Sequence, residues 1–325
     1  MIRTRKLYYF IAFFLAIVWI SCKKNPNQAV TPTPPPFEYK TKNVIIVVVD
    51  GPRWTETWGD ATRTYIPKRN ALLSQGVLCN KIYNMGTTST VPGHVAICTG
   101  YYQKIPNDGT AYPEKPTIFQ YFLKEKNQPA SKAWVITTKD KLEVLSDCTD
   151  PAWQGKFRPM HDCGNDGLGS GYRLDSKTMA VVYSKLTSDR PNLMIINYKQ
   201  PDEGGHQGDS LRYLRGISDT DEFLDQLWTT LQSDTAYKEK TTMIVTNDHG
   251  RHTAGHKDGF ISHGDECDGC RHIEMFAIGP DFKKNFTTNT TYEQVDITNT
   301  VAELLNFKVP TSGGKVIQDV FTKLK

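Results

Sequence analysis

The sequence lacks a hydrophobic run long enough to span a membrane comfortably, and it lacks an excess of charge of one sign. Its most apolar stretch runs from Leu7 to Ile20, which is shorter than the roughly 20 residues that a transmembrane helix needs. The chain has 39 basic and 35 acidic residues, and three of the basic ones precede that stretch. The remaining 36 nearly balance the acidic residues, so composition indicates neither nucleic acid nor an anionic membrane surface as a partner. The sequence also contains no internal repeat.

Three basic residues followed by a short apolar stretch are typical of a signal peptide. The stretch ends in Ile20-Ser21-Cys22, and a small residue before Cys resembles the bacterial lipoprotein cleavage box, although Trp19 stands where Leu is common. We therefore predict that residues 1–22 are a lipoprotein signal peptide and that Cys22 is lipidated. An ordinary secretory signal or an uncleaved anchor is the alternative. The prediction implies an exported protein of the periplasm or cell envelope, held at a bacterial membrane only through its lipid anchor.

The segment that follows, residues 23–42, is rich in proline among polar residues. Such a composition favours an extended polyproline-like tether of about 3 Å per residue. The prolines are Pro26, Pro32, Pro34, Pro35 and Pro36. The tether leaves residues 43–325 as one catalytic domain.

Six cysteines remain after Cys22, an even number in a chain that we expect in an oxidising compartment. We therefore predict disulfides. Cys267-x-x-Cys270, followed by His272, could instead be half of a zinc knuckle or a redox pair, but the sequence lacks a second Cys pair at matching spacing. A small disulfide loop is the favoured interpretation. The other four are Cys79, Cys98, Cys148 and Cys163.

Short β-branched runs alternate with helical patterns along the chain, as in α/β folds. The run 44–49 is apolar on both faces, which predicts a central strand covered by helices. Further strands are expected at 133–136, 193–197, 242–246 and 273–278, and helices at 66–74, 117–126, 176–186, 211–231 and 295–305. The sequence therefore predicts an α/β fold with a central, mostly parallel sheet between helices. The Gly- and Asp-rich stretch 148–173 is expected to be an irregular lid or a substrate-facing insertion.

Polar residues stand where three of these strands end. Asp50-Gly51 follows the first strand, Asp202 to His206 follows the third, and Asn247-Asp248-His249-Gly250 follows the fourth. Ligands bind beyond the carboxyl ends of strands in such sheets, so these side chains should meet at one edge. A single Asp at a strand end is usually a turn residue, but three such ends with His263-Gly264 downstream indicate a metal site.

The stretch from Gly86 to Gly100 reads GTTSTVPGHVAICTG. Small hydroxylated residues meet Pro92 and then an apolar segment, which predicts a helix with Pro92 in its first turn and Thr90 at its start. Free N–H groups and the helix dipole stabilise negative charge there, which suits an alkoxide or a phosphoryl oxygen. Thr90 is therefore a candidate nucleophile, and a simple N-cap is the alternative.

Together these motifs resemble the alkaline phosphatase superfamily, in particular its nucleotide pyrophosphatase/phosphodiesterase-like members and related bacterial phosphomonoesterases. The resemblance covers nearly all of the chain after the tether. It rests on five motifs in order: Asp50-Gly51 after a strand, Thr90-x-Pro-x-His94 with Thr99-Gly100, Pro201-Asp202-x-x-x-His206, Asp248-His249-Gly250, and His263-Gly264 ahead of Gly279-Pro280.

The resemblance implies two zinc ions about 4 Å apart, which clamp the attacking and leaving oxygens of an in-line displacement. One Zn²⁺ would bind Asp202, His206 and His263. The other would bind Asp50, Asp248, His249 and the oxygen of Thr90. His252, His256 and His272 are the alternatives to His263, and His94 is expected to pack behind the site rather than to bind metal.

Two departures bear on the substrate. Gly93 stands where nucleotide pyrophosphatases commonly have Asn, and Pro-Gly-His is associated more with phosphomonoesterase-like relatives. Lys139 and Lys141 resemble the Lys-Asp-Arg segment that holds a phosphate monoester dianion, with Lys replacing the bidentate Arg. Two solvated loop lysines are the alternative. Asn107 would supply a phosphate-binding amide.

The resulting prediction is a metal-dependent phosphoric ester hydrolase that acts on a small-molecule phosphate ester, chiefly a monoester, through a phosphothreonine at Thr90. A phosphodiesterase or nucleotide pyrophosphatase is the first alternative. A sulfatase is disfavoured because the usual Cys or Ser signature is missing. A non-catalytic, metal-stabilised binding lipoprotein is the alternative from another class. The pattern specifies no oligomeric state.

Overall fold

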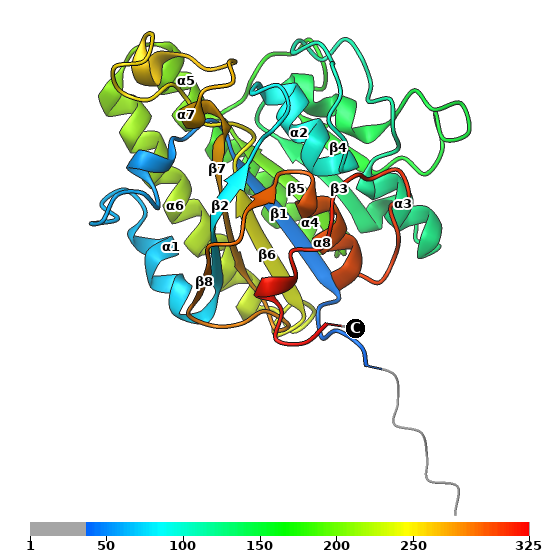
Figure 1. Ribbon diagram of the computed structural model, residues 1–325. Coiled ribbons are helices and arrows are strands. Elements are labelled where there is room, and N and C mark those ends of the chain that lie inside the picture. The colour runs from blue at the N-terminus through cyan, green and yellow to red at the C-terminus, as the bar shows by residue number, and fades with distance from the viewer. Residues whose placement is uncertain (1–36, 325) are drawn as a thin grey trace, which may run out of the picture. The chain divides into compact units, whose positions relative to one another are not determined.

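The computed structural model describes residues 37–324 (Figure 1). The predicted signal peptide, Cys22 and most of the tether lie outside these residues. The compact unit begins at Glu38, five residues before the boundary expected from the sequence, because Thr41 is bound to the domain. Its N–H and its Oγ1 each donate to the Asp281 carboxylate at 2.7 Å. Between residues 37 and 324 the structure contains no helix with the length and hydropathy of a membrane span.

A nine-stranded sheet forms the centre of the domain. Eight strands follow the order β4-β3-β5-β1-β6-β7-β2-β8, and β9 pairs with β2. The strands are β1 (Asn43–Val49), β2 (Val77–Tyr83), β3 (Ala133–Thr137), β4 (Met160–Cys163), β5 (Leu193–Tyr198), β6 (Thr241–Thr246), β7 (His272–Ile278), β8 (Phe286–Thr288) and β9 (Tyr292–Glu293).

The central strand β1 is buried along its whole length. It pairs in parallel with β5 and β6, so that Val47 lies between Ile196 and Val245. β3 and β4 continue the parallel part, whereas β7 runs antiparallel to both β6 and β2. The prediction of a mostly parallel α/β sheet is confirmed, and all five predicted strands are present.

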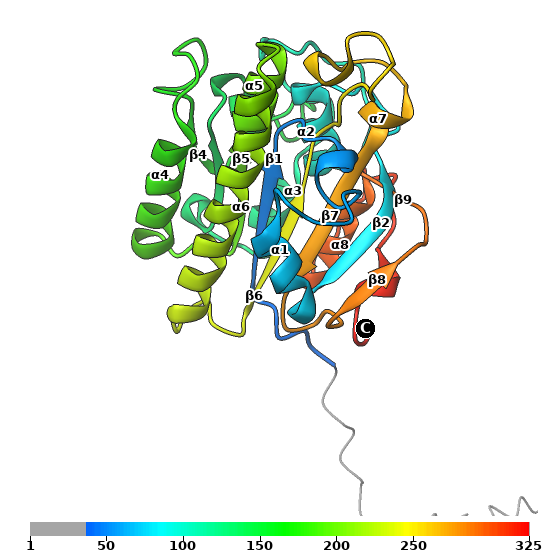
Figure 2. The ribbon, with the colours of Figure 1, turned by 90° about the vertical axis from the view of Figure 1, so that its left-hand side faces the viewer.

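Helices cover both faces of this sheet (Figure 2). One face carries α1 (Pro67–Leu72), α4 (Asp175–Ser188) and α6 (Ser210–Ser233), and the other carries α2 (Thr90–Thr99), α3 (Ile118–Glu125) and α8 (Asp296–Leu304). Alternate residues of β1, including Val47, share a buried cluster with Leu224 and Leu227 of α6. Two short helices, α5 (Gln200–His206) and α7 (Asp268–Arg271), lie above the sheet.

The stretch 148–173 is less irregular than expected. It contains β4, which pairs in parallel with β3 at the edge of the sheet. The sequence of β4, Met-His-Asp-Cys, is largely polar because only Cys163 of this edge strand is buried. Periodicity therefore gave no signal for this strand. The remainder of the stretch is held down by backbone N–H groups of Leu168 and Gly171, which donate to Glu143 and Asp140.

The six cysteines among the described residues are free thiols, and the predicted disulfides are not formed in this structure. Cys79 lies in β2, Cys98 in α2 and Cys163 in β4, so these thiols belong to separate elements of the core. Burial raises the pKa of Cys79 and of Cys163 to about 12, which keeps both thiols protonated.

Candidate active site

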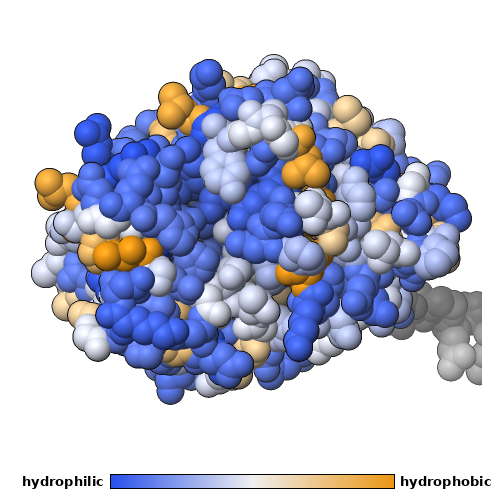
Figure 3. Space-filling model, turned by 90° about the horizontal axis from the view of Figure 1, so that it is seen from above, coloured by the Kyte–Doolittle hydropathy of each residue, from blue (hydrophilic) through white to orange (hydrophobic). Residues whose placement is uncertain are grey.

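The carboxyl ends of four neighbouring strands bring the predicted site residues together. β3, β5, β1 and β6 are adjacent and parallel, so they end at the same edge, which lies at the top of Figure 1. Lys139 follows β3, α5 follows β5, Asp50 follows β1, and Asp248 follows β6. Figure 3 looks down on this edge and shows a mostly hydrophilic surface.

Asp202, His206 and His263 form one half of the site. Their ligand atoms lie within 4.8 Å of one another. Asp202 and His206 are four residues apart on α5 and therefore face the same way. The two His Nε2 atoms are 3.1 Å apart, and they lie 3.3 Å and 3.5 Å from Asp202 Oδ1.

The other three histidines considered for this position point elsewhere. His252 and His256 face Asp265 through their Nε2 atoms. The Nε2 atom of His272 lies 2.8 Å from the carbonyl oxygen of Asn80. The structure thus brings His263, and not these alternatives, to Asp202.

Asp50, Asp248 and His249 form the other half, and all three are fully buried. Asp248 Oδ1 accepts the N–H groups of Gly51 and His249 at 3.2 Å and 3.0 Å. Its Oδ2 lies 3.4 Å from His249 Nε2. Ligand atoms of Asp50 and His249 also lie within 4.8 Å of one from Asp202, so the two halves are contiguous.

Several atoms aimed into this site are buried without a hydrogen-bond partner. They are Asp50 Oδ1, Asp248 Oδ2 and His249 Nε2. An unsatisfied buried polar atom costs about 1–3 kcal/mol, and more when it is charged. His249 and His263 each direct Nδ1 to a backbone carbonyl at 2.8 Å, which leaves Nε2 for a ligand, as in metal-binding histidines. The chemistry of these residues therefore fits bound metal cations.

Lys139 lies in the middle of the carboxylates. Its Nζ atom is 2.6 Å from Asp202 Oδ2 and 2.9 Å from Asp50 Oδ2, and it donates to Thr90 Oγ1 at 3.2 Å. Burial alone would lower the pKa of Lys139, but the negative charges of Asp202 and Asp50 raise it above the usual value. Lys139 is therefore an internal counter-ion.

Lys141 is half-buried beside this group. Burial and the positive charge of Lys139 lower its pKa, whereas the site carboxylates act in the opposite sense. Lys141 thus belongs to the electrostatic environment of the site. Of these two lysines, Lys139 is the one that contacts the carboxylates.

The ionisation of the site residues follows from burial and charge. Burial and the charge of Asp248 raise the pKa of Asp50 to about 7. For Asp202, burial is outweighed by Lys139 and the neighbouring imidazoles, and the pKa falls well below its usual value. Burial lowers the pKa of His249 to about 3. His249 is therefore neutral, and thus able to bind metal, at physiological pH.

Thr90 is the first residue of α2, and Ser89 occupies the N-cap position. The predicted helix start, with Pro92 in the first turn, is confirmed, and Thr90 is not the cap. Asn107 lies beside Thr90, where its Oδ1 accepts the N–H of Val91 at 2.8 Å. The side-chain oxygen of Asn107 thus stabilises the start of α2. The side-chain NH₂ group of Asn107 remains available to a phosphate.

Close packing fixes α2 against the end of β6. A Cβ atom on Gly93 would lie 2.4 Å from the carbonyl oxygen of Asp248. His94 packs behind Thr90, as expected, with Nδ1 2.8 Å from the carbonyl oxygen of Thr90 and Nε2 3.2 Å from Asn197 Nδ2.

Two residues of the site were not predicted. Arg251 is buried and pairs with Asp202 Oδ1 through Nη1, and its Nε and Nη2 donate to the carbonyls of Phe260 and Ile261 at 2.5 Å. Asn197 donates to Asp50 Oδ2 at 3.1 Å. The available signals were an Arg directly after Asp-His-Gly and a polar residue inside the apolar run of β5.

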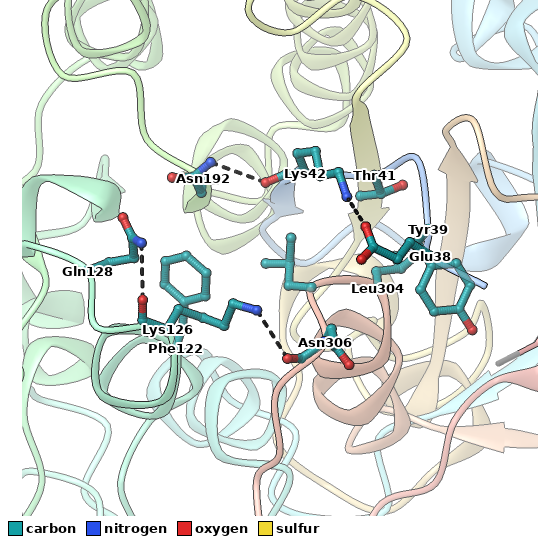
Figure 4. A pocket seen from close by; sticks show the side chains of 11 residues that line it. Glu38, Tyr39, Thr41, Lys42, Phe122, Lys126, Gln128, Asn192, Leu304 and Asn306 are labelled. Atoms are coloured by element: carbon teal, nitrogen blue, oxygen red, sulfur yellow. Dashed lines mark hydrogen bonds and ion pairs between the residues drawn. The ribbon is translucent and has the colours of Figure 1, made fainter. Parts of the chain in front are cut away.

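Two cavities help to locate the substrate side. One of about 280 Å³ lies by Lys42 and Asn192, which precede β1 and β5 (Figure 4), so it is at the opposite edge of the sheet from the site. Another, of about 320 Å³, is lined by Thr88, Tyr102 and Gly264 among others. Since Thr88 and Gly264 neighbour the site residues in the chain, this second cavity adjoins the predicted metal centre.

Comparisons with known proteins agree with this geometry. The family model for type I phosphodiesterase / nucleotide pyrophosphatase matches residues 44–263. The fold resembles murine ectonucleotide pyrophosphatase/phosphodiesterase 5, with a TM-score of 0.61, 19% identity and coverage of 86% of this chain and 100% of that one. It also resembles a phosphonate monoester hydrolase from Silicibacter pomeroyi, with a TM-score of 0.61, 14% identity and coverage of 87% and 77%.

A third similar structure is the lipoteichoic acid synthase LtaP from Listeria monocytogenes, with a TM-score of 0.60, 14% identity and coverage of 85% and 74%. A comparison with curated protein sequences finds no match. At these identities the solved structures establish the shared fold.

Proposed function

Because the chain belongs to the type I phosphodiesterase / nucleotide pyrophosphatase family, we propose that it hydrolyses small-molecule phosphate esters at a two-zinc centre. Asp202, His206 and His263 would hold one Zn²⁺, and Asp50, Asp248 and His249, with the Thr90 oxygen, would hold the other. The observation that carries the proposal is the group of buried, unpartnered ligand atoms beside the Thr90 hydroxyl. Bound zinc would stabilise the negative charge of the attacking and leaving oxygens.

The residues of the chain then have distinct tasks. Thr90 Oγ1 loses its proton and forms a bond to phosphorus while the bond between phosphorus and the ester oxygen breaks, which gives a phosphothreonine and an alcohol that takes up a proton. Water later breaks the phosphothreonine bond, which releases phosphate and restores the hydroxyl. The start of α2 places Thr90 where free N–H groups and the helix dipole favour negative charge. Lys139 Nζ, 3.2 Å from Thr90 Oγ1, would contact a non-bridging phosphate oxygen.

The nucleophile can be tested by replacing Thr90 with alanine. We expect Thr90→Ala to lower kcat by at least about 10³-fold, because the covalent route is lost while the metal ligands remain. Thr90→Ser retains a hydroxyl and should keep most of the activity. A murine relative of this fold has been solved as an inactive Thr-to-Ala variant in complex with AMP, which supports the assignment. Unchanged turnover in Thr90→Ala would exclude Thr90 as the nucleophile.

A phosphate monoester is the first candidate substrate. Lys139 Nζ lies 3.2 Å from Thr90 Oγ1, and once metal cations balance Asp50 and Asp202, its charge and that of Lys141 would suit a dianion. A phosphodiester or a nucleotide pyrophosphate is the second candidate, and the family match favours it. Hydrolysis of p-nitrophenyl phosphate and of its bis-ester should be compared in the wild type and in Lys139→Ala. A diester preference that survives Lys139→Ala would contradict the monoester proposal.

We also propose that the protein is an exported lipoprotein anchored through Cys22. The arrangement of basic residues, the apolar stretch and Ser21-Cys22 supports this. Mass spectrometry of the amino terminus of the membrane fraction should detect a lipid-modified Cys22, and Cys22→Ser should release the protein from the membrane. A retained, unmodified leader would contradict the proposal.

A non-catalytic binding protein is the competing possibility from another class. Zinc analysis of the purified chain, combined with the Thr90→Ala kinetics, separates the two. Bound zinc without hydrolysis of either ester would favour the binding protein.

A further inference from the structure

A second group of metal-binding side chains lies outside the site described above. We propose that His252, Asp265, Cys267 and Cys270 form a structural zinc site. One ligand atom from each of the four residues lies within 4.8 Å of the others. The proposed hydrolysis uses none of these four side chains, so this site is a separate feature of the protein.

The chemistry of the four ligands selects the ion. Two sulfur ligands, one imidazole and one carboxylate are a set that suits tetrahedral Zn²⁺. Bonds of about 2.0–2.3 Å hold neighbouring ligands roughly 3.3–3.8 Å apart, so the observed group needs to contract only slightly. Cys267 is the N-cap of α7, and its Sγ accepts the N–H of Cys270 at 3.4 Å, which already directs both residues to the same side.

His252 carries the clearest indication of a missing ligand. Its side chain is only 2% exposed, and its Nε2 atom is buried without a hydrogen-bond partner. Its Nδ1 lies 2.8 Å from the Asp258 carboxylate. A carboxylate on one ring nitrogen fixes the ring and leaves the other nitrogen as a metal ligand. That nitrogen lies 3.3 Å from Asp265 Oδ2 without forming a hydrogen bond to it.

Asp265 gathers positive charge on the exposed side of the group. Its Oδ2 lies 2.7 Å from Lys257 Nζ and 3.0 Å from His256 Nε2, and its Oδ1 accepts the N–H of Cys267 at 3.0 Å. Lys257 is exposed and His256 is half-buried, so His256 can turn toward water when a metal takes its place at Asp265. Two thiolates and one carboxylate exceed the charge of Zn²⁺ by one, and Lys257, which can stay close to Asp265, compensates that charge.

The site explains why the sequence pattern looked incomplete. In the sequence, Cys267-x-x-Cys270 is followed by His272 and lacks a second Cys pair at matching spacing. His272 instead faces Asn80 and stacks on Trp54 with ring centroids 4.3 Å apart. The completing ligands precede the pair in the chain, and only the fold of the segment 252–270 brings them to it.

The position of the site suggests that it stabilises the segment 252–270. Its ligands lie at the two ends of the segment 252–270, which contains His263 of the predicted catalytic centre. The N–H of Gly250, next to His249, donates to the carbonyl of Cys270 at 2.8 Å. A zinc ion bound here would therefore hold the segment that delivers His263. A Cys267–Cys270 disulfide would close only α7 and would leave His252 unconnected.

Cobalt substitution of the full chain tests the site independently of catalysis. The purified protein is stripped with a chelator, loaded with Co²⁺ and examined for thiolate-to-cobalt charge-transfer absorption. The predicted catalytic centre contains only carboxylates, imidazoles and a hydroxyl, so it cannot produce this band. We expect the band in the wild type and in Asp202→Asn, and its loss in the double variant Cys267→Ser/Cys270→Ser. The double variant should also bind one zinc ion fewer per chain.

Cys163→Ser is the matched control, because its buried Sγ faces the carbonyl of Val135 at 3.8 Å and lies in β4. It should retain the band. Absence of the charge-transfer band from the Co²⁺-loaded wild type would overturn the proposal. This measurement does not depend on the folding of any variant. A mass lower by two hydrogens without reductant, localised to Cys267 and Cys270 and accompanied by no band, would also overturn it in favour of the disulfide.

Discussion

At the scale of single residues, Lys139 affects both the stability of the metal-free protein and the change in stability when zinc binds. Its ammonium group contacts Asp50 and Asp202 and so balances charge that bound cations would otherwise balance. Removing one partner of a buried ion pair costs about 3–5 kcal/mol. We expect Lys139→Met to lower the free energy of unfolding of the metal-free protein by about that amount, and added zinc to restore most of it. Urea unfolding with and without zinc measures both effects.

Lys141→Met is the control for this experiment, because Lys141 is half-buried and forms no ion pair with those carboxylates. It should change the stability of the metal-free protein far less. An equal loss in Lys139→Met with and without zinc would show that Lys139 is simply a packing residue.

Asp50 makes metal binding dependent on pH. Its pKa in the metal-free site is about 7, so above pH 7 the carboxylate is ready to bind. Below pH 7 a proton must leave before metal binds, and zinc affinity should fall by up to about tenfold per pH unit from this group. His249, with a pKa of about 3, contributes no such competition in this range.

A chelator-competition titration from pH 8 to pH 5.5 measures the affinity. Asp50→Asn should bind zinc more weakly at every pH. The slope of its zinc affinity against pH should be smaller, because one proton fewer is released on binding. The same slope in both proteins would show that Asp50 is not the group that competes.

At the scale of the elements, α2 and the end of β6 fit together without spare room. The Asp248 carbonyl, 2.4 Å from a Cβ built on Gly93, cannot move freely because Asn84 and Gln294 donate to it at 2.8 Å and 2.9 Å. We expect Gly93→Ala to cost about 1–3 kcal/mol of stability and to weaken zinc binding by displacing Asp248. Thermal unfolding and zinc titration measure these changes.

Gly313→Ala is the matched control, because a Cβ there would meet nothing closer than 3.9 Å. It should leave both quantities nearly unchanged. The same geometry gives a steric reason for glycine, rather than asparagine, at position 93.

How well the elements could be predicted from the sequence depends on where they lie in the sheet. The five central strands were predictable because burial on both faces leaves continuous apolar runs, as in β1. β2, with Asn80 and Lys81, and β4 were missed because strands nearer the edges bury only some of their residues. Neither their pairing nor their order in the sheet is encoded in local periodicity.

Some residues of the candidate site could likewise be predicted from the sequence, and others could not. Asp50, Asp248 and His249 were predictable because each lies within three residues of the end of a buried strand. Arg251 was not, because its role depends on Asp202, which lies on another element. The same holds for the contact of Asn107 with Val91, which only the folded chain reveals.

At the scale of the whole molecule, the residues just before β1 belong to the domain. The N–H groups of Lys40 and Thr41 and the Thr41 hydroxyl all donate to the buried Asp281 carboxylate. A chain that begins at Phe37 should therefore match the full domain in stability, whereas one that begins at Asn43 should lose about 1–3 kcal/mol. Urea unfolding of both chains at equal zinc concentration measures the difference. Identical unfolding midpoints would show that these contacts contribute nothing.

The predicted ligands come from the ends of β1 and β6, from α2 and α5, and from the segment before α7, so they span most of the domain in sequence. No fragment that ends before His263 contains the full set, and no early folding unit can assemble it. A chain clipped or released before His263 would thus lack part of the ligand set and, under the proposed function, would not hydrolyse phosphate esters. Hydrolysis would then report that translation has proceeded at least past His263.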